Sequence, residues 1–200
     1  MPTWSSGNRY LTQAEMEYNA QLVQEYGLNA GWTRNAICAM LGNMEAESGI
    51  NPGIWENLTP WQGGYGLVQW TPYTKYATWA GTGWQNNGDM EMDRIAWEVE
   101  NNVQWFHNYE LGIDPPYDFA DFMADDTTPL EDMTNYWLWF YEHPANPIQP
   151  GRYSNAQYWD SFLDWDNPPD PPPDPPEPPE PPEPPFPYWI LFKFRGRGLH

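Results

Sequence analysis

The spacing of polar and apolar residues predicts a helix near the start of the chain. Thr12, followed three positions later by Glu15, has the pattern of a capping box, in which both side chains bond to backbone amides where a helix begins. Gly27 is of the residue type that commonly follows the end of a helix. The first predicted helix therefore covers Thr12 to Tyr26.

A second helix is predicted over residues 33–47. Thr33 can cap its start, and Gly49 and Pro52 break its continuation. The apolar residues that recur at helical spacing inside it are Ile37, Met40, Leu41 and Met44.

Residues 53–72 have no helical period. Glycines and prolines alternate with aromatic residues in GIWENLTPWQGGYGLVQWTP, which is typical of a loop and a short hairpin. Helical spacing returns over 89–109, and two further helices are predicted over 134–142 and 155–165, separated by a loop. The predicted class is mostly α, with one small irregular β-hairpin region.

The composition changes after Trp165. Of the 24 prolines, 14 lie between residues 168 and 187, in a Pro-Pro-acid repeat that favours polyproline II and extends over about 60 Å at ~3.1 Å per residue. The last segment, 188–200, is aromatic and then basic, which favours a docking peptide for a protein partner or a membrane surface; an untidy terminus or a truncated second domain are the alternatives. We therefore expect a domain over 1–165, a linker over 166–187 and a docking peptide over 188–200.

Charge and cysteine content exclude several classes of function. Residues 1–165 carry 22 acidic and five basic side chains, a net charge of -17 that repels nucleic acid. The one cysteine, Cys38, excludes an internal disulfide and is expected to be a small buried group, and the three scattered histidines lack the spacing of a metal motif. We expect no metal, no cofactor, no signal peptide and no membrane-spanning helix.

Carboxylates are the remaining candidates for catalysis. Glu45 and Glu47 lie near the end of the second predicted helix, on opposite sides of its apolar stripe, and the helical period does not choose between them. The helix dipole and partial burial beside tryptophans would raise the pKa of either acid, as a glycosidase needs for protonating a leaving oxygen. The alternative is that both are solvated acids at a fraying helix end.

The stretch GGYGLVQWT, residues 63–71, has the composition of a sugar-binding loop. Glycines let backbone approach a ligand, Gln69 offers an amide, and Tyr65 and Trp70 offer flat apolar faces. A tight hairpin whose aromatic side chains fill the core would have the same composition.

Several motifs together resemble one family. GNMEAESGINPG, GYGLVQWTP and WFYEHPANP, with the opening YLTQAEMEYNAQLV and the segment RIAWEVENNVQWF, follow one another in the order found in the lysozyme-like phage tail lysins. The resemblance covers nearly all of residues 8–165, and goose-type lysozymes and lytic transglycosylases are more distantly similar. It implies a lysozyme-like fold of the mostly α (α+β) class.

The resemblance also implies roles for individual residues. Glu47 would be the general acid, and Ser48 would orient its carboxyl group. Backbone amides from Gly66 to Gln69 would line the sugar site, and Glu56 is a candidate second carboxylate. The residues given a substrate-binding role in this way or by their chemistry are Ser48, Tyr65, Gly66, Leu67, Val68, Gln69, Trp70, Tyr141 and Glu142. At His143 the family pattern leads us to expect a cationic side chain instead.

The implied function is cleavage of the β-1,4 bond between N-acetylmuramic acid and N-acetylglucosamine in bacterial peptidoglycan. The implied location is the tail tip of a phage particle, with tail proteins as partners through residues 188–200. The alternatives are an endolysin or a lytic transglycosylase acting on the same bond, and a non-catalytic tail protein that binds the wall.

Overall fold

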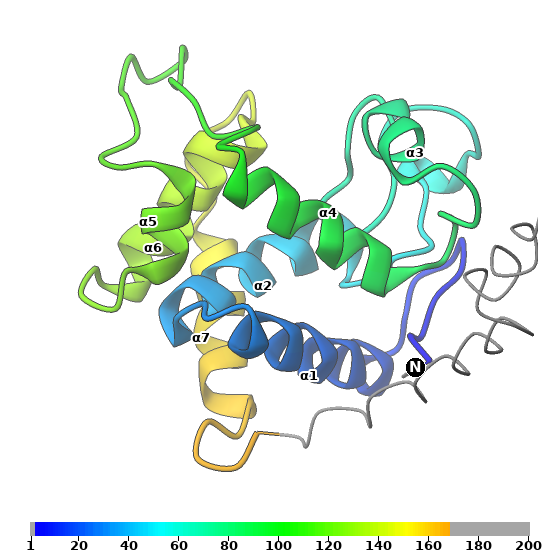
Figure 1. Cartoon of the computed structure of the whole chain (residues 1–200), viewed down its shortest axis with the longest axis horizontal. Coiled ribbons are helices and arrows are strands. Elements are labelled where there is room, and N and C mark those ends of the chain that lie inside the picture. Colours follow the sequence, from blue (N-terminus) through cyan, green and yellow to red (C-terminus); the bar gives the residue numbers. More distant parts are fainter. Residues whose placement is uncertain (1–2, 169–200) are drawn as a thin grey trace, which may run out of the picture. The chain divides into compact units, whose positions relative to one another are not determined.

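Helices make up most of residues 3–168, the part of the chain that this computed structural model describes (Figure 1). Isolated antiparallel bridges, Trp55 with Tyr65 and Asn108 with Ile113, are the β structure within that range, so the predicted mostly α class is confirmed. The elements are α1 Gln13–Asn29, α2 Arg34–Ser48, the 3-10 turn η1 Glu56–Leu58, α3 Thr74–Ala80, α4 Gly88–Glu100, α5 Phe119–Ala124, α6 Leu130–Trp137, the π-helical turn η2 Leu138–Glu142 and α7 Pro150–Phe162.

Helix α1 begins where its capping box predicts. The Thr12 side chain accepts a hydrogen bond from the Glu15 amide, and the Glu15 carboxylate accepts one from the Thr12 amide at 2.8 Å. The predicted end at Tyr26 is wrong, because the helix continues to Asn29. Gly27 is buried against α2, and a Cβ there would lie 2.8 Å from Ile37, so the glycine serves close helix packing and not termination.

Helix α2 is the central helix of the domain. The Thr33 side chain caps its start and Gly49, at φ 62°, ends it in the left-handed conformation, so both predicted ends are confirmed to within a residue. Residues 36–44 are all buried, as expected for a helix with neighbours on every side. Its contacts are with α1, α5, α6 and α7, and Figure 1 shows it in the middle of the bundle.

A close approach of α2 and α7 depends on Gly42. A Cβ at this position would lie 2.5 Å from the carbonyl oxygen of Arg152 and 2.7 Å from the amide nitrogen of Ala156. The absence of a side chain at Gly42 therefore brings the start of α7, and with it Arg152, onto the second half of α2.

Helix α4 is shorter than predicted. It ends at Glu100 and not at Tyr109, because Asn102 turns the backbone at φ 49° and its side chain accepts a hydrogen bond from the Phe119 amide at 2.9 Å. The turn buries Trp105, whose ring stacks on Phe119 at 4.7 Å. The chain therefore leaves the helix after Glu100 and buries Trp105 against Phe119 instead of continuing the helix.

The helices of the last third begin earlier than predicted. Helix α6 starts at Leu130, after Pro129, and not at Thr134. Helix α7 starts at Pro150 and not at Asn155, because proline is well suited to the first helical position. The short helices α3 and α5 have too few residues to show a period and are not predicted at all.

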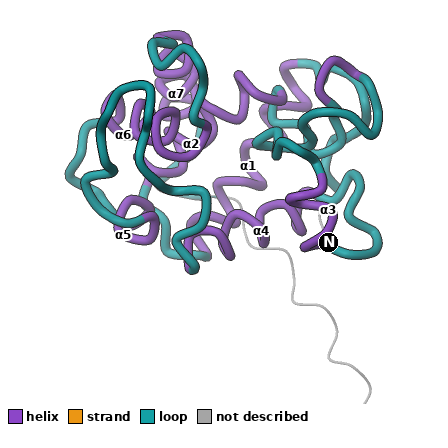
Figure 2. Tube along the Cα trace, turned by 90° about the horizontal axis from the view of Figure 1, so that it is seen from above, coloured by secondary structure: helices purple, strands orange, loops and turns teal. Residues whose placement is uncertain are grey.

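The remaining predictions concern loops and the C-terminal segments. The predicted hairpin over 53–72 contains the single bridge between Trp55 and Tyr65, and Figure 2 shows mainly loop beside α3. Cys38 is buried, as expected.

The two predicted C-terminal segments lie outside the described residues, apart from the first three residues of the linker. These segments are the linker over 166–187 and the docking peptide over 188–200. Among residues 3–168, no helix is both long and apolar enough to cross a bilayer.

Candidate active site

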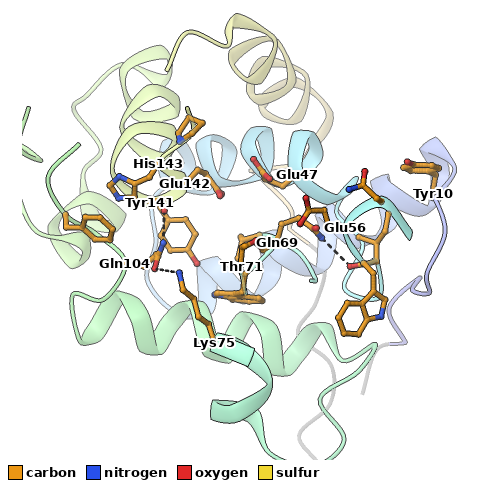
Figure 3. Close-up of a pocket in the computed structure, with 17 residues that line it drawn as sticks. Tyr10, Glu47, Glu56, Gln69, Thr71, Lys75, Gln104, Tyr141, Glu142 and His143 are labelled. Atoms are coloured by element: carbon orange, nitrogen blue, oxygen red, sulfur yellow. Dashed lines mark hydrogen bonds between the residues drawn. The ribbon is translucent and has the colours of Figure 1, made fainter. Parts of the chain in front are cut away.

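A cavity of about 710 Å³ lies beside the end of α2 (Figure 3). Its other walls come from the glycine-rich loop, which is residues 63–71, from η1, from the segment after α4 and from the end of η2. Its lining residues are Tyr10, Glu47, Ile54, Trp55, Glu56, Asn57, Val68, Gln69, Trp70, Thr71, Lys75, Gln104, Phe106, Tyr141, Glu142, His143 and Pro144.

Glu47 reaches this cavity from the last turn of α2, and its side chain is 24% exposed. One of its carboxyl oxygens accepts a hydrogen bond from a terminal nitrogen of Arg152, on α7. The Arg152 guanidinium is buried and also donates to the Asn43 side chain at 3.1 Å and to the Gln149 side chain at 2.9 Å. The cation is therefore held in place by three side chains, and it in turn fixes the orientation of the Glu47 carboxyl group.

Glu45 points elsewhere. Its carboxylate accepts a hydrogen bond from the Trp159 indole at 2.8 Å, and it is not among the residues that line the cavity. Burial raises the pKa of Glu45, and the bond from Trp159 opposes that rise in part. The choice that the helical period leaves open is thus made by packing, which brings Glu47 to the cavity and Glu45 against α7.

Glu142 is the second acid of this part of the cavity. It is the last residue of η2, and Figure 3 shows it pointing into the cavity toward Glu47. Burial raises the pKa of Glu142 well above its ordinary value, the negative charge of Glu47 raises it further, and Arg152 opposes both effects. The Trp137 indole donates to one of its oxygens at 3.0 Å.

Tyr141 precedes Glu142, is buried, and also lines the cavity. Its hydroxyl donates to the Glu98 carboxylate at 2.6 Å, and Glu98 also accepts from Trp70 at 3.2 Å and from Arg94 at 2.9 Å. Burial raises the pKa of Glu98, and these three partners oppose the rise. Glu98 therefore joins two walls of the cavity from behind.

Sequence reasoning missed Glu98 and its neighbour on the same face, Glu91. The two acids are seven residues apart, and both lie on the buried side of α4, as Ile95 does. A pair of acids on the apolar face of a helix was the available signal, since such acids need partners in the interior.

The glycine-rich loop is held by Glu91, whose carboxylate accepts the Leu67 amide at 2.7 Å. Burial raises the pKa of Glu91 well above its ordinary value. The Gly66 amide donates to Ile54 at 3.1 Å and the Gln69 amide to Gly66 at 3.1 Å. The amides of Gly66, Leu67 and Gln69 are thus bonded inside the protein. Val68 and Gln69 line the cavity, and the Gln69 side-chain amide donates to the carbonyl oxygens of Ile54 at 3.3 Å and Gly66 at 3.0 Å.

Ser48 is buried and does not line the cavity. Its hydroxyl lies 2.8 Å from the carbonyl oxygen of Leu67 and 3.0 Å from that of Met44, and accepts a hydrogen bond from the Asn51 amide at 3.4 Å. In this structure Ser48 therefore connects the end of α2 to the glycine-rich loop and has no hydrogen bond to Glu47.

The aromatic residues of the loop divide into core and cavity. Tyr65 is 1% exposed, its hydroxyl accepts the Asn86 amide at 2.8 Å, and it does not line the cavity. Leu67 is likewise fully buried. Trp70 and Trp55 are mostly buried but present part of their rings to the cavity.

Glu56 also lines the cavity, on the exposed turn η1, and its carboxylate accepts a hydrogen bond from the Gly64 amide at 2.9 Å.

His143 follows Glu142 and stacks on Phe106 at 3.9 Å between ring centres. Burial lowers the pKa of His143. Lys75 lines the cavity and carries a positive charge there. Within residues 3–168, no three His, Cys, Asp or Glu side chains are grouped to hold a metal ion.

The chain is similar to known phage proteins. A family model described as phage tail lysozyme matches residues 18–163. Morphogenesis protein 1 of Bacillus phage B103 is 46% identical over 162 residues, which cover 77% of this chain and 41% of that protein. The chain thus spans about two fifths of the length of this relative. With most of its described residues inside the family match, the chain belongs to the phage tail lysozyme family.

Proposed function

We propose that this chain cleaves the β-1,4 bond between N-acetylmuramic acid and N-acetylglucosamine in peptidoglycan. One observation carries the proposal: the carboxyl group of Glu47 is hydrogen-bonded to Arg152, and Glu47 lines a cavity of about 710 Å³. Aromatic rings and amide side chains on the other walls are of the kind that bind sugars, and the family membership of the chain favours this substrate class.

In the proposed reaction, Glu47 gives its proton to the glycosidic oxygen while the bond from that oxygen to the sugar ring breaks. The ring carbon becomes positively charged, and Glu47 is left as a carboxylate. Arg152 stabilises this carboxylate, because an opposite charge at contact distance is most favourable when the acid is ionised. The contact therefore strengthens as the proton leaves, which is the condition for an interaction to speed the reaction.

In the reaction that we propose, a water molecule adds to the positively charged ring carbon and loses a proton. The alternative is attack by the 6-hydroxyl of the muramic acid, which gives an anhydro product, as in lytic transglycosylases. Mass spectrometry of digested walls separates the two, because the anhydro fragment is lighter by one water.

We place this activity in a phage particle, at the tail tip, where it would open the host wall during entry. The family match and the name of the relative, a phage morphogenesis protein, support that location. We propose that residues 188–200 bind tail proteins. Deleting residues 166–200 should then leave wall cleavage intact and prevent incorporation into particles. Incorporation of the shortened chain would overturn the role given to residues 188–200, and absence of the unaltered chain from particles would favour an endolysin instead.

The central test is Glu47→Gln, which keeps the shape of the side chain and removes its proton. A loss of about 10²- to 10⁴-fold in release of sugar fragments from walls is expected, with wall binding unchanged. Glu45→Gln is the matched control, since Glu45 lies on the same helix turn and away from the cavity. Full lysis by Glu47→Gln, or a loss confined to Glu45→Gln, would overturn the assignment. Wall binding by the unaltered chain without release of fragments would identify a non-catalytic binder.

A further inference from the structure

Arg152 influences two acids of the cavity. It is hydrogen-bonded to Glu47, and its positive charge also acts on Glu142. These three side chains come from different elements, α7, α2 and η2, that meet at one end of the cavity. Figure 3 shows the carboxyl groups of Glu47 and Glu142 pointing toward one another.

The groups around Glu142 leave it short of positive charge. Glu47 faces it from α2 and Glu98 acts on it from α4, so two acids oppose its ionisation. Arg152 is the cation that faces it, while Trp137 donates an uncharged hydrogen bond. His143, the next residue, is half-buried and stacked on Phe106, and Lys75 lines the same cavity and lies 3.5 Å from the Gln104 side chain.

The charges of this group balance when one proton is present. Two ionised carboxylates with one guanidinium would leave a net negative charge in a partly buried space, which is unfavourable. A single proton makes the trio neutral. Neighbouring acids that interact this strongly lose their protons as a pair and not independently.

We propose that Glu142 is the second catalytic carboxyl group of this enzyme, and that Glu47 and Glu142 hold one proton between them. The inference rests on the proposed function for its catalytic part. When a glycan occupies the cavity, the shared proton passes through Glu47 to the glycosidic oxygen, and the carbon–oxygen bond breaks with its electron pair left on that oxygen. Both carboxylates are then ionised, and Glu142 faces the positive ring. Water adds to the ring carbon, and the proton that it loses restores the pair.

Glu56, the acid that sequence reasoning placed in this role, has a different setting. Its carboxylate lies on an exposed turn and is occupied by the Gly64 amide at 2.9 Å. Within residues 3–168 it forms no ion pair with a basic side chain. An exposed, singly bonded acid lacks the coupling that a proton pair needs.

The kinetic test is Glu142→Gln in the full chain. Release of fragments from walls should fall about 10²-fold or more, with wall binding unchanged, and the bell-shaped dependence on pH should lose one limb. Glu131→Gln is the matched control, because Glu131 is an exposed acid in the first turn of α6, away from the cavity. Activity of Glu142→Gln within about threefold of the unaltered chain, or a comparable loss in Glu56→Gln alone, would overturn the proposal.

An infrared titration tests the shared proton without any substrate. The protonated carboxyl band that Glu142→Gln removes identifies Glu142, and in Glu47→Gln this band should disappear at lower pH than in the unaltered chain. The reason is that the negative neighbour is gone and Arg152 is free to pair with Glu142. If no protonated carboxyl band moved to lower pH in Glu47→Gln, the shared proton would be overturned, even if Glu142→Gln failed to fold. If the unaltered chain released no fragments at all, the proposed function and the catalytic role would fall, and the shared proton would be decided by the titration.

Discussion

The hydroxyl of Ser48 lies 2.8 Å from the carbonyl oxygen of Leu67, and this contact fastens the end of α2 to the glycine-rich loop. The adjacent residue, Glu47, is the acid that reaches the cavity, so the position of its backbone depends on the same fastening. The loop is held from its other side by the buried Glu91.

Replacing Ser48 with alanine should destabilise the fold. The carbonyl oxygen of Leu67 would lose a buried hydrogen bond, which costs about 1 to 2 kcal/mol in the free energy of unfolding. Urea titration measures this, and Ser154→Ala is the control, because its hydroxyl is exposed on α7 and the change should stay within about 0.5 kcal/mol. Unchanged stability with lost activity would restore a direct role for Ser48 at the Glu47 carboxyl.

Replacing Gly42 with alanine should separate α2 from α7. The new methyl group would stand 2.5 Å from the carbonyl oxygen of Arg152, so the helices must move apart at a cost of about 1 to 3 kcal/mol. Gly151→Ala, on the same pair of helices, meets nothing within 4 Å and should be neutral or stabilising by up to about 1 kcal/mol. Thermal unfolding of the two variants, compared with the unaltered chain, decides whether close packing at Gly42 is needed.

Replacing Arg152 with methionine should move the pH profile of wall cleavage to higher pH. The arginine lowers the pKa of Glu142, so without it Glu142 keeps its proton to higher pH. Arg34→Met is the control, since Arg34 joins the same helices through an exposed pair with Asp160, far from the lining residues. A profile that stays in place or moves to lower pH would contradict the role given to Arg152.

Replacing Glu91 with glutamine should flatten the dependence of stability on pH. Burial raises the pKa of Glu91 in the fold, whereas the unfolded chain ionises it near the ordinary value, so the native state binds more protons between these two values. Stability therefore falls as pH rises through that interval, and the glutamine removes this part of the fall. Urea midpoints at about pH 5 and about pH 8 measure it, with Glu131→Gln as the exposed control. A fall as steep in Glu91→Gln as in the unaltered chain would assign it to other acids.

Features set by neighbouring residues were predictable from sequence. The caps at Thr12 and Thr33 and the stop at Gly49 depend on local backbone bonds, and the structure has them where the pattern places them. The early end of α4 was not predictable, because it depends on burying Trp105 against Phe119, fourteen positions along the chain.

The site divides in the same way. A carboxyl group at the end of α2 follows from the local sequence, but the choice of Glu47 over Glu45 requires the positions of Arg152 and Trp159 on α7. Composition alone made Tyr65 an attractive sugar platform, because an aromatic ring among glycines fits a binding loop and a core equally well. The packing of Tyr65 against Trp55, at 4.7 Å between ring centres, decides for the core.

The π-helical turn η2 makes the cavity sensitive to the length of one segment. Its adjacent residues serve different walls, since Tyr141 bonds to Glu98 on α4 while Glu142 points toward Glu47 on α2. Deleting a single residue from Leu138–Phe140 would close the turn as an ordinary α-helix, with the His143 amide bonded to a carbonyl four residues before it instead of five. Such a deletion would leave Tyr141 and Glu142 in the chain but remove the wider turn on which they now sit, so the arrangement of this cavity depends on residue count as well as on residue type.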